Sequence, residues 1–384
     1  MSTVEEKQKE RMEIRNDYLA GKKPKRVFVA PNFSWEAACD LAGIELMKVH
    51  YNIGLLEQAY EKICATFPSD VMMGSYRDSL HVFQLLGAKN WIAGSNGMIQ
   101  HPEIETMKAE DYDEFIKAPY KTIIEKFLPR VCTALDKDPY TNTLNLATAY
   151  GAYKNVSAAE RPISGKVAAK YGFVPEFMNN QRILAPFDFL ADQLRGFKAI
   201  SMDVRRIPDK VKAAVEVITP LMIKTAIPPV MRQGLCSSIP LHMGPYLNKK
   251  AFDELFWPSF EKLVVELDKI GIRCRLFAEQ DWTRYCDALA SLPKSTIVCF
   301  ETGDPKRLAE TVGKDHIIGG FYDPTITLVR SKEECIDEAK RLLDIVMKTG
   351  KYYFTFDKRI LDIKCINVSK LQAVLEWIYE NAKY

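Results

Sequence analysis

The sequence has no long hydrophobic run. Across its 384 residues, no stretch approaches the roughly 18 consecutive apolar residues that a membrane-spanning helix needs. Residues 1–26 are charged throughout and contain no apolar segment, unlike a signal peptide or a transit peptide. We therefore expect a cytoplasmic protein that does not insert into a membrane.

The sequence also has little net charge. Its 53 basic and 50 acidic side chains leave a formal charge of +3, which is too small for the basic footprint of a nucleic-acid-binding or membrane-binding protein. No nucleic-acid-binding motif with interleaved aromatic residues occurs. We expect neither a nucleic-acid partner nor a membrane partner.

Paired cysteines and glycine-rich phosphate loops are missing as well. The nine cysteines are scattered singly, without a CxxC pair, which is typical of reduced thiols in a cytoplasm. Most of them should be small core residues, although one or two, together with some of the five histidines, could be metal ligands. No GxGxxG or GxxxxGK(S/T) follows a predicted strand, which argues against a Rossmann or a P-loop protein.

The second half of the sequence alternates strand-like and helix-like segments. The strand-like runs are 235–241, 272–277, 296–300, 316–319 and 352–356, and the amphipathic stretches are 249–270, 282–291, 304–312, 331–349 and 367–382. Such an alternation with short connections predicts parallel strands joined by crossover helices. We therefore predict an α/β fold, a TIM (β/α)8 barrel that forms a single domain over residues 1–384.

The first half is predicted to contribute strands and a helical extension. We expect helices over 4–20, 35–66 and 208–223, a first strand at 25–30, and a short strand at 70–73. Residues 1–25 and about 100–165 are predicted to be helical elaborations of the barrel. Asp111 is expected to be the N-cap of a helix.

A barrel fold predicts where the chemistry lies. Active sites of (β/α)8 barrels are built at the carboxyl ends of the strands. The polar or aromatic residues at these positions are His242, Glu279, Asp281, Cys299, Glu301, Tyr322, Asp323 and Asp357. Three consecutive strands are thus expected to bring an imidazole, a carboxylate and a thiol to one rim.

These residues also have structural interpretations. Glu279 and Asp281 could cap the helix that follows them. His242 could be a hydrogen-bonded loop histidine, and Cys299 could be an ordinary core residue. His316 begins its strand rather than ending it, so we expect it to be structural.

Longer segments resemble a known family. Residues 225–265 and 272–345 look like the uroporphyrinogen decarboxylase superfamily, through LHMGPYLNKKAFDELFWPSFEKLV, LFAEQDWTRYCDALASLP and FETGDPKRLAETVGKDHIIGGFYDPTITLV. The first half resembles it in GMIQHPEIETMKAEDYDEFI and DQLRGFKAISMDVRRIPDKV. The resemblance covers nearly the whole chain and implies a barrel.

That superfamily contains two activities. Its decarboxylases need no cofactor and hold the carboxylates of a tetrapyrrole with arginines just after the first strand. The matching place here reads Ala30-Pro-Asn-Phe-Ser-Trp35 and has no arginine, so a porphyrin substrate would lack its countercharges. The sequence looks closest to the other branch, zinc-dependent methyltransferases that exchange methyl groups with a corrinoid protein.

Within that branch, the resemblance implies a zinc site. Methanol- and methylamine-system enzymes have a His-x-Cys motif at the end of the fifth strand, where this chain has Phe277 and Glu279. Zinc ligands in O-demethylase relatives include Glu and His as well as Cys, so the implied set is His242, Glu279 and Cys299. A carboxylate in place of a thiolate leaves zinc more electrophilic, which suits an oxygen donor.

The resemblance therefore implies an enzyme that cleaves a methyl ether. It would pass the methyl group of a methoxylated aromatic compound to Co(I) of a corrinoid protein, with zinc as the Lewis acid. Glu279 and Asp281 are the expected catalytic residues, and Asp281 would orient a zinc ligand or accept a phenol proton. The expected substrate contacts are Asn32, Trp35, Tyr246 and Tyr322, whose aromatic members also fit general packing.

No DxHxxG corrinoid-binding motif occurs, so the corrinoid is expected to arrive on a partner protein. The chain could also form a homodimer. Two other functions stay open: a cofactor-free, uroporphyrinogen decarboxylase-like decarboxylase, and a corrinoid- or tetrapyrrole-binding module without enzymatic activity.

Overall fold

The structure is a computed structural model that describes residues 3–76 and 79–384. Its chain divides into two units. Unit 1 comprises Met1–Arg77, Ala158–Met178 and Arg275–Tyr384, and unit 2 comprises Asp78–Ser157 and Asn179–Cys274. Much of the predicted helical elaboration at 100–165 belongs to unit 2, and the single-domain organisation stays a prediction.

Unit 1 contains a parallel sheet. Its strands are β5 (Arg273–Asp281), which begins in unit 2, followed by β6 (Ile297–Thr302), β7 (Ile317–Gly320) and β8 (Tyr352–Tyr353). Each pairs in parallel with the next. All four residues of β7 are buried, as expected for a parallel strand covered on both faces. The predicted strand runs and their parallel order are therefore confirmed in unit 1.

Two segments from the N-terminal half continue this sheet beyond β8. Val29 forms a parallel bridge with Phe354, and the N–H of Asp70 donates to the carbonyl of Val29 at 2.8 Å. The N–H of Val174 in turn donates to the carbonyl of Asp70 at 3.1 Å. The predicted strands at 25–30 and 70–73 are thus joined to the sheet by a bridge and single backbone hydrogen bonds, and they do not form long strands. Closure into the predicted eight-stranded barrel is not seen within the described residues.

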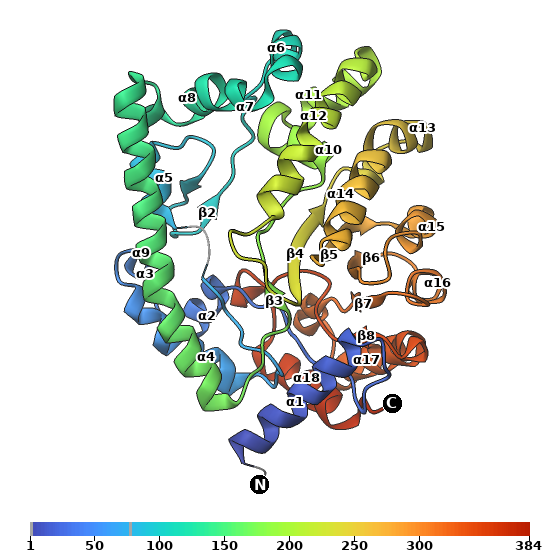
Figure 1. The fold of residues 1–384 in the computed structure, drawn as a ribbon. Coiled ribbons are helices and arrows are strands. Elements are labelled where there is room, and N and C mark those ends of the chain that lie inside the picture. The colour runs from blue at the N-terminus through green and yellow to red at the C-terminus, as the bar shows by residue number, and fades with distance from the viewer. Residues whose placement is uncertain (1–2, 77–78) are drawn as a thin grey trace. The chain divides into compact units, whose positions relative to one another are not determined.

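The helices of unit 1 flank these strands in sequence. In Figure 1, α15, α16 and α17 lie outside the strands that they connect. The range 35–66, which was expected to be helical, contains three α-helices. The α-helices are α1 (Val4–Leu19), α2 (Trp35–Leu41), α3 (Leu46–Tyr51), α4 (Leu56–Thr66), α15 (Cys286–Ala290), α16 (Pro305–Thr311), α17 (Lys332–Val346) and α18 (Val368–Asn381).

Unit 2 is mainly helical around one long strand, β4 (Leu235–Leu241), which has the predicted bounds. It also holds the antiparallel hairpin of β1 (Ile92–Ala93) and β2 (Ile99–Gln100). Its α-helices are α5 (Leu80–Leu86), α6 (Tyr112–Lys117), α7 (Pro119–Thr122), α8 (Leu128–Val131), α10 (Pro186–Phe189), α11 (Phe197–Arg206), α12 (Pro208–Ala226), α13 (Lys249–Ala251) and α14 (Trp257–Lys269). Two further elements, α9 (Pro139–Tyr171) and β3 (Met178–Asn179), run across the unit boundaries.

The prediction that Asp111 is the N-cap residue of a helix is confirmed for α6. Asp111 precedes α6, but its carboxylate makes no cap hydrogen bond to that helix. It accepts from the N–H of Lys108 at 2.8 Å instead, and it pairs with Arg130 at 2.5 Å and with Lys126 at 2.8 Å. These cations hold the pKa of this buried carboxyl well below its usual range, even though burial acts in the opposite direction.

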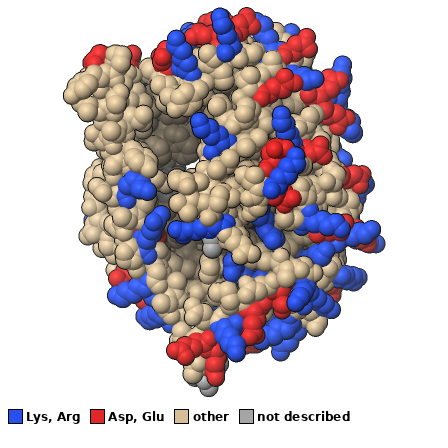
Figure 2. Space-filling model, viewed as in Figure 1, with Lys and Arg blue, Asp and Glu red and all other residues tan. Residues whose placement is uncertain are grey.

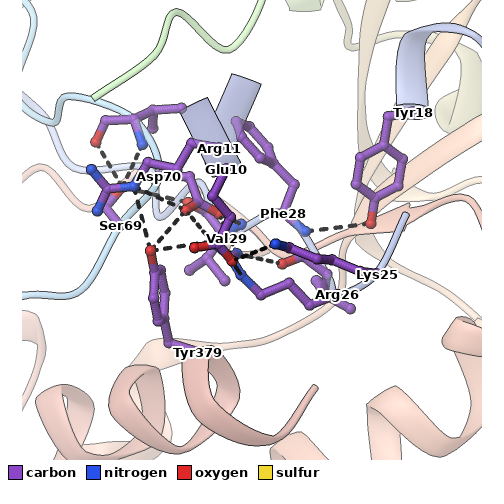
Figure 3. Close-up of polar contacts among 12 residues, drawn as sticks. Glu10, Arg11, Tyr18, Lys25, Arg26, Phe28, Val29, Ser69, Asp70 and Tyr379 are labelled. Carbon is purple, nitrogen blue, oxygen red and sulfur yellow. Dashed lines mark hydrogen bonds and ion pairs between the residues drawn. The ribbon is translucent and has the colours of Figure 1, made fainter. Parts of the chain in front are cut away.

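A buried ion-pair network ties together the ends of unit 1. Asp70 is fully buried and accepts two parallel hydrogen bonds of 2.8 Å from Arg26. Figure 3 shows Arg11 from α1 and Tyr379 from α18 pointing at the same carboxylate. The N–H of Val29 adds a further hydrogen bond of 2.8 Å. The carboxylate of Asp70 therefore joins α1, α18 and the segment 25–30.

Two composition-based expectations can be compared with the structure. Among residues 3–76 and 79–384, no helix is both long enough and apolar enough to cross a membrane. All nine cysteines are free, and only Cys365 is exposed. The thiols are therefore mostly core residues, as the sequence predicts.

Candidate functional site

His242 follows the last residue of β4 and is held by two aspartates. Its main-chain N–H and that of Met243 donate to the two oxygens of Asp188, at 2.9 and 3.0 Å. Its ring Nδ1–H donates to Asp192 Oδ2 at 2.5 Å. Asp188 therefore fixes the turn after the strand, and Asp192 fixes the orientation of the imidazole.

Local sequence explains why both aspartates face His242. Asp188 lies in the first turn of α10, which begins at Pro186, a residue well suited to the first position of a helix. The helix continues without interruption as a π-helix, Leu190–Arg195, that carries Asp192. Residues four apart lie on the same side of a helix, so both carboxylates are presented on one face.

The environment of Asp188 favours its protonated form. The carboxyl group is fully buried, and burial raises the pKa of Asp188 to about 7. The neighbouring charge of Asp192 acts in the same direction, while His242 acts against it. The pair of aspartates beside His242 thus includes one carboxyl group that titrates near neutral pH, as is common in functional sites.

A cavity of about 520 Å³ opens beside His242 and Asp192, within the size range of small-molecule sites. Every residue that lines it belongs to unit 2. Its aromatic walls include Trp91 and His101, whose ring centroids lie 4.4 Å apart, and burial lowers the pKa of His101. The lining residues are Trp91, His101, Glu103, Arg182, Ile183, Leu184, Ala191, Asp192, Gln193, Gly196, Phe197 and His242.

Tyr246 lies next to this cavity. Its ring, 57% exposed, packs edge-to-face against Phe197 with the centroids 5.3 Å apart. Tyr246 contacts Phe197, and both Phe197 and His242 line the cavity. With Trp91 and Phe197, the walls suit a flat apolar ring, and Arg182 and Gln193 add polar groups.

A second group of polar residues lies at the carboxyl ends of the strands in unit 1. Glu301 accepts from the N–H of Gln280 at 2.7 Å and lies 3.4 Å from the ammonium of Lys358. Asp357 is buried, and burial, reinforced by the charge of Asp323, raises its pKa to about 7. These carboxylates form an acidic rim with one lysine.

The strand that carries Glu279 and Asp281 ends with a distorted backbone. The ladder of β5 with β6 shifts register between Ala278 and Asp281, and Gln280 has a φ of 64°, which is uncommon for a residue with a side chain. This irregularity lets β5 continue to Asp281, beyond the predicted end at residue 277. Asp281 Oδ1 accepts from the N–H of Thr283 at 2.8 Å, but the 3-10 helix Thr283–Tyr285 has Trp282 as its N-cap and no side-chain cap hydrogen bond.

Cys299 lies deeper in unit 1, among polar side chains. It pairs in register with Phe277, so it shares a face with Glu279, two residues further along β5. Its sulfur lies 3.2 Å from the hydroxyl of Tyr353, which accepts from Arg275 Nε at 3.2 Å. Burial raises the pKa of Cys299, with Arg275 and Tyr353 acting against this shift.

Three of the residues predicted to contact substrate lie in unit 1, where two are buried and one is half-buried. Trp35 is 1% exposed and packs against His50 and Tyr76. Tyr322 is also 1% exposed and donates to the carbonyl of Cys335 at 3.1 Å. Asn32 is half-buried and accepts from the N–H of Ile360 through its carbonyl. Their role in substrate binding stays a prediction.

The predicted zinc ligands are divided between the units. His242 belongs to unit 2, and Glu279 and Cys299 belong to unit 1. In the part of the chain that the structure describes, no three His, Cys, Asp or Glu side chains gather closely enough to hold a metal ion. The zinc set therefore stays a prediction. Of its members, His242 fits best, because metal-ligating histidines usually donate their other ring N–H to a carboxylate, as His242 does to Asp192.

Sequence reasoning missed four residues of the site around His242: Asp188, Asp192, Trp91 and His101. One signal was available, because Asp188 and Asp192 are spaced by four in the otherwise apolar stretch PFDFLAD. Two carboxylates on one face of an apolar helix require partners. Trp91 and His101 have no comparable signal, since they come from a hairpin far from β4 in sequence.

The fold and site define a class of protein. It is an α/β protein with a parallel sheet whose polar residues collect after the carboxyl ends of the strands, the usual place for active sites in such folds. Residues 182–357 match the family model described as "Uroporphyrinogen decarboxylase (URO-D)". This match agrees with the predicted resemblance over these residues.

The chain is also similar to solved structures. A methyltransferase from Methanosarcina mazei has the same fold, with a TM-score of 0.58 and 12% sequence identity. The match covers 99% of each chain. No curated protein sequence matches the chain.

Proposed function

We propose that this chain is a methyltransferase that moves a methyl group from a methoxylated aromatic compound to the cobalt of a corrinoid carried by a partner protein. The observation that carries the proposal is the cavity after β4, where His242 and Asp192 meet the aromatic walls of Trp91 and Phe197. The fold shared with a methyltransferase, over nearly the full length of both chains, supports the same reaction class. The proposal includes the closed barrel implied by the family.

The cavity residues have distinct roles in this proposal. Trp91 and Phe197 hold the flat ring of the donor and exclude water, so that the methyl group stays in place for attack. Arg182 and Gln193 bind polar substituents on the ring. Asp192 keeps the imidazole of His242 oriented towards the methoxy oxygen. Co(I) donates the electron pair of the new bond to the methyl carbon, and the O–CH3 bond breaks. The oxygen keeps the electron pair of the broken bond and then takes up a proton.

Of the three proposed zinc ligands, His242 lines the cavity. His242 would hold a zinc ion, with Glu279 and Cys299 as the proposed further ligands, and zinc would supply a Lewis acid for the ether oxygen. Cys299 would have to release its proton first, because a cysteine ligand binds as the thiolate. Asp281 is proposed to accept or deliver the phenol proton. The free state of all nine cysteines is compatible with the reducing cytoplasm that we propose for this activity.

A second candidate is a cofactor-free decarboxylase, which the description of the matching family favours. The loop at residues 30–35 argues against a tetrapyrrole substrate. It contains no arginine, and its Phe33 is buried, stacked on Phe67 with ring centroids 4.6 Å apart. Multiple substrate carboxylates would find no countercharge there.

The test is a panel of methyl donors offered with free cob(I)alamin. Methoxybenzoates, methanol and methylamines are each incubated with the purified chain, with and without added zinc, and methylcobalamin is measured by absorbance. We expect turnover with methoxybenzoates, and an increase on addition of zinc. Absence of methyl transfer from every donor, together with release of carbon dioxide from a porphyrinogen, would establish the decarboxylase instead.

A further inference from the structure

The cavity beside His242 contains a second imidazole, that of His101. His101 follows β2 directly and lines the same cavity as His242 and Asp192. In Figure 2 the surface is hollowed where Figure 1 draws the segment after β2 beside α10, and both segments belong to unit 2. His101 is exposed, so a molecule bound in the cavity can reach its ring.

Contacts on both sides of His101 in sequence fix the place of its imidazole. The ring of His101 lies against Trp91, with the centroids 4.4 Å apart, and Trp91 stacks on Phe83 of α5 at 5.4 Å. Two residues after His101, Glu103 Oε1 accepts from the N–H of Lys198, in the first turn of α11, at 3.2 Å. The imidazole is therefore a fixed part of the cavity wall.

Burial and a neighbouring charge act in opposite directions on this imidazole. Burial lowers the pKa of His101, and the charge of Asp192 acts against this shift. The carboxylate of Asp192 thus acts on both imidazoles of the cavity, since it also accepts from Nδ1 of His242. An imidazolium with a lowered pKa is a stronger acid than an ordinary one, so it gives its proton to an oxygen more readily.

The other titratable residues that line the cavity are less suited to deliver a proton. Asp192 and His242 are hydrogen-bonded to each other, and Glu103 accepts from the start of α11. Arg182 keeps its proton, as arginine does throughout proteins. His101 is therefore the lining residue best able to exchange a proton with a molecule bound in the cavity.

We propose that His101 is the acid that protonates the leaving oxygen during methyl transfer, an inference that rests on the proposed methyltransferase function. Co(I) donates an electron pair to the methyl carbon and the O–CH3 bond breaks. The oxygen keeps the electron pair of that bond and takes the proton of the His101 imidazolium. His101 is left as a neutral imidazole and regains a proton from water once the product has left. Asp281, the other candidate for this proton, belongs to unit 1.

The test compares two methyl ethers whose oxygens need a proton to different degrees. A methoxybenzoate leaves as a basic phenolate, whereas 4-nitroanisole leaves as a weakly basic nitrophenolate that gains little from an acid. Methyl transfer to cob(I)alamin in a single turnover is measured with the full-length wild type, His101→Gln and Asp281→Asn, and the rate of cob(I)alamin alone is subtracted. The reaction with 4-nitroanisole is the matched control, because a change in folding or in ring binding would slow both ethers. Circular dichroism checks that each variant is folded.

We expect His101→Gln to slow transfer from the methoxybenzoate by about 100-fold or more, and transfer from 4-nitroanisole by no more than about threefold. Equal losses with both ethers, or no loss with either, would overturn the assignment of His101 while leaving the methyltransferase function intact. A selective loss in Asp281→Asn but not in His101→Gln would also overturn it. If the wild type transfers no methyl group from the methoxybenzoate, the proposed function fails and this inference fails with it. If His101→Gln does not fold, His101→Asn is held to the same expectations.

Discussion

At the scale of single residues, His242 depends on side chains that do not come from its own strand. Asp192 orients its ring and Asp188 holds its backbone. His242 was predictable because polar residues after a parallel strand mark the active-site end of the sheet. Asp188 and Asp192 were harder to predict, because their contact with His242 joins segments about fifty residues apart in sequence.

Replacing Asp192 tests its role as a positioning residue. In Asp192→Asn the amide cannot act as a charged acceptor, so the imidazole loses its fixed orientation. We expect kcat for methyl transfer to fall by about 10–100-fold, with KM changed much less. Asp209→Asn is the matched control, because Asp209 is exposed at the start of α12. Equal losses in both variants, or a loss confined to KM, would contradict this role.

The carboxyl group of Asp357 makes stability depend on pH. Burial and the charge of Asp323 raise its pKa in the folded chain to about 7, from an ordinary value of 3.8. Between about pH 4 and pH 7 the unfolded chain releases this proton while the folded chain keeps it. The contribution of Asp357 to stability is therefore full below about pH 4, and is lost as the pH rises to about 7.

Asp357→Asn should remove this dependence. We expect the variant to be more stable than the wild type by roughly 1–3 kcal/mol at pH 8, and the difference to shrink towards zero near pH 4. Denaturant unfolding at both pH values measures it. Asp344→Asn, at an exposed position of α17, should show no such trend. A variant that is equally destabilised at both pH values would disprove this account.

At the scale of elements, the strands were the most predictable part of the fold. β4 has the predicted bounds, and β6, β7 and β8 form within the predicted runs or one or two residues beyond them, because continuous apolar runs are typical of buried parallel strands. The end of β5 could not be predicted, since it depends on the positive φ of Gln280, which no local pattern requires. The π-helix that carries Asp192 likewise follows from packing rather than from periodicity.

The end of β7 requires a glycine. Gly320 has a φ of 93°, and a Cβ at this position would collide with the main chain of Phe300. Gly320→Ala should therefore reduce the free energy of unfolding by about 2 kcal/mol or more. Gly165→Ala is the control, because a Cβ there meets no other atom within 4 Å, and in the helix α9 it should stabilise the chain by about 0.5–1 kcal/mol. Thermal unfolding of the two variants gives both values. If both changes had the same sign, the strain argument at Gly320 would be wrong.

At the scale of the whole molecule, one buried carboxylate connects the beginning and the end of unit 1. Removing the charge of Asp70 would leave Arg11 and Arg26 buried without their shared partner. We expect Asp70→Asn to lower the free energy of unfolding by about 3–5 kcal/mol. Denaturant unfolding measures the loss. Glu10→Gln should cost about 1 kcal/mol or less, because the side chain of Glu10 is 38% exposed. A loss for Asp70→Asn no greater than that of the control would contradict the role of the network.

The whole-molecule features differ in how far the sequence could predict them. The parallel α/β class follows from the order of elements, and the family resemblance is confirmed over residues 182–357. The network around Asp70 could not be predicted, because it joins residues more than 300 positions apart, such as Asp70 and Tyr379. The pairing of Trp91 with His101 in the cavity wall depends on a hairpin whose strands are two residues long, too short for a recognisable pattern.

The central claim is that the cavity beside His242 carries out methyl transfer. The direct test is a single-turnover reaction in which a methoxybenzoate with an isotopically labelled methyl group is mixed with cob(I)alamin and either the wild type or His242→Ala. We predict that the wild type places the label on cobalt, and that His242→Ala does so at least about 100 times more slowly. Equal transfer by both proteins, or no labelled methylcobalamin with the wild type, would contradict the claim.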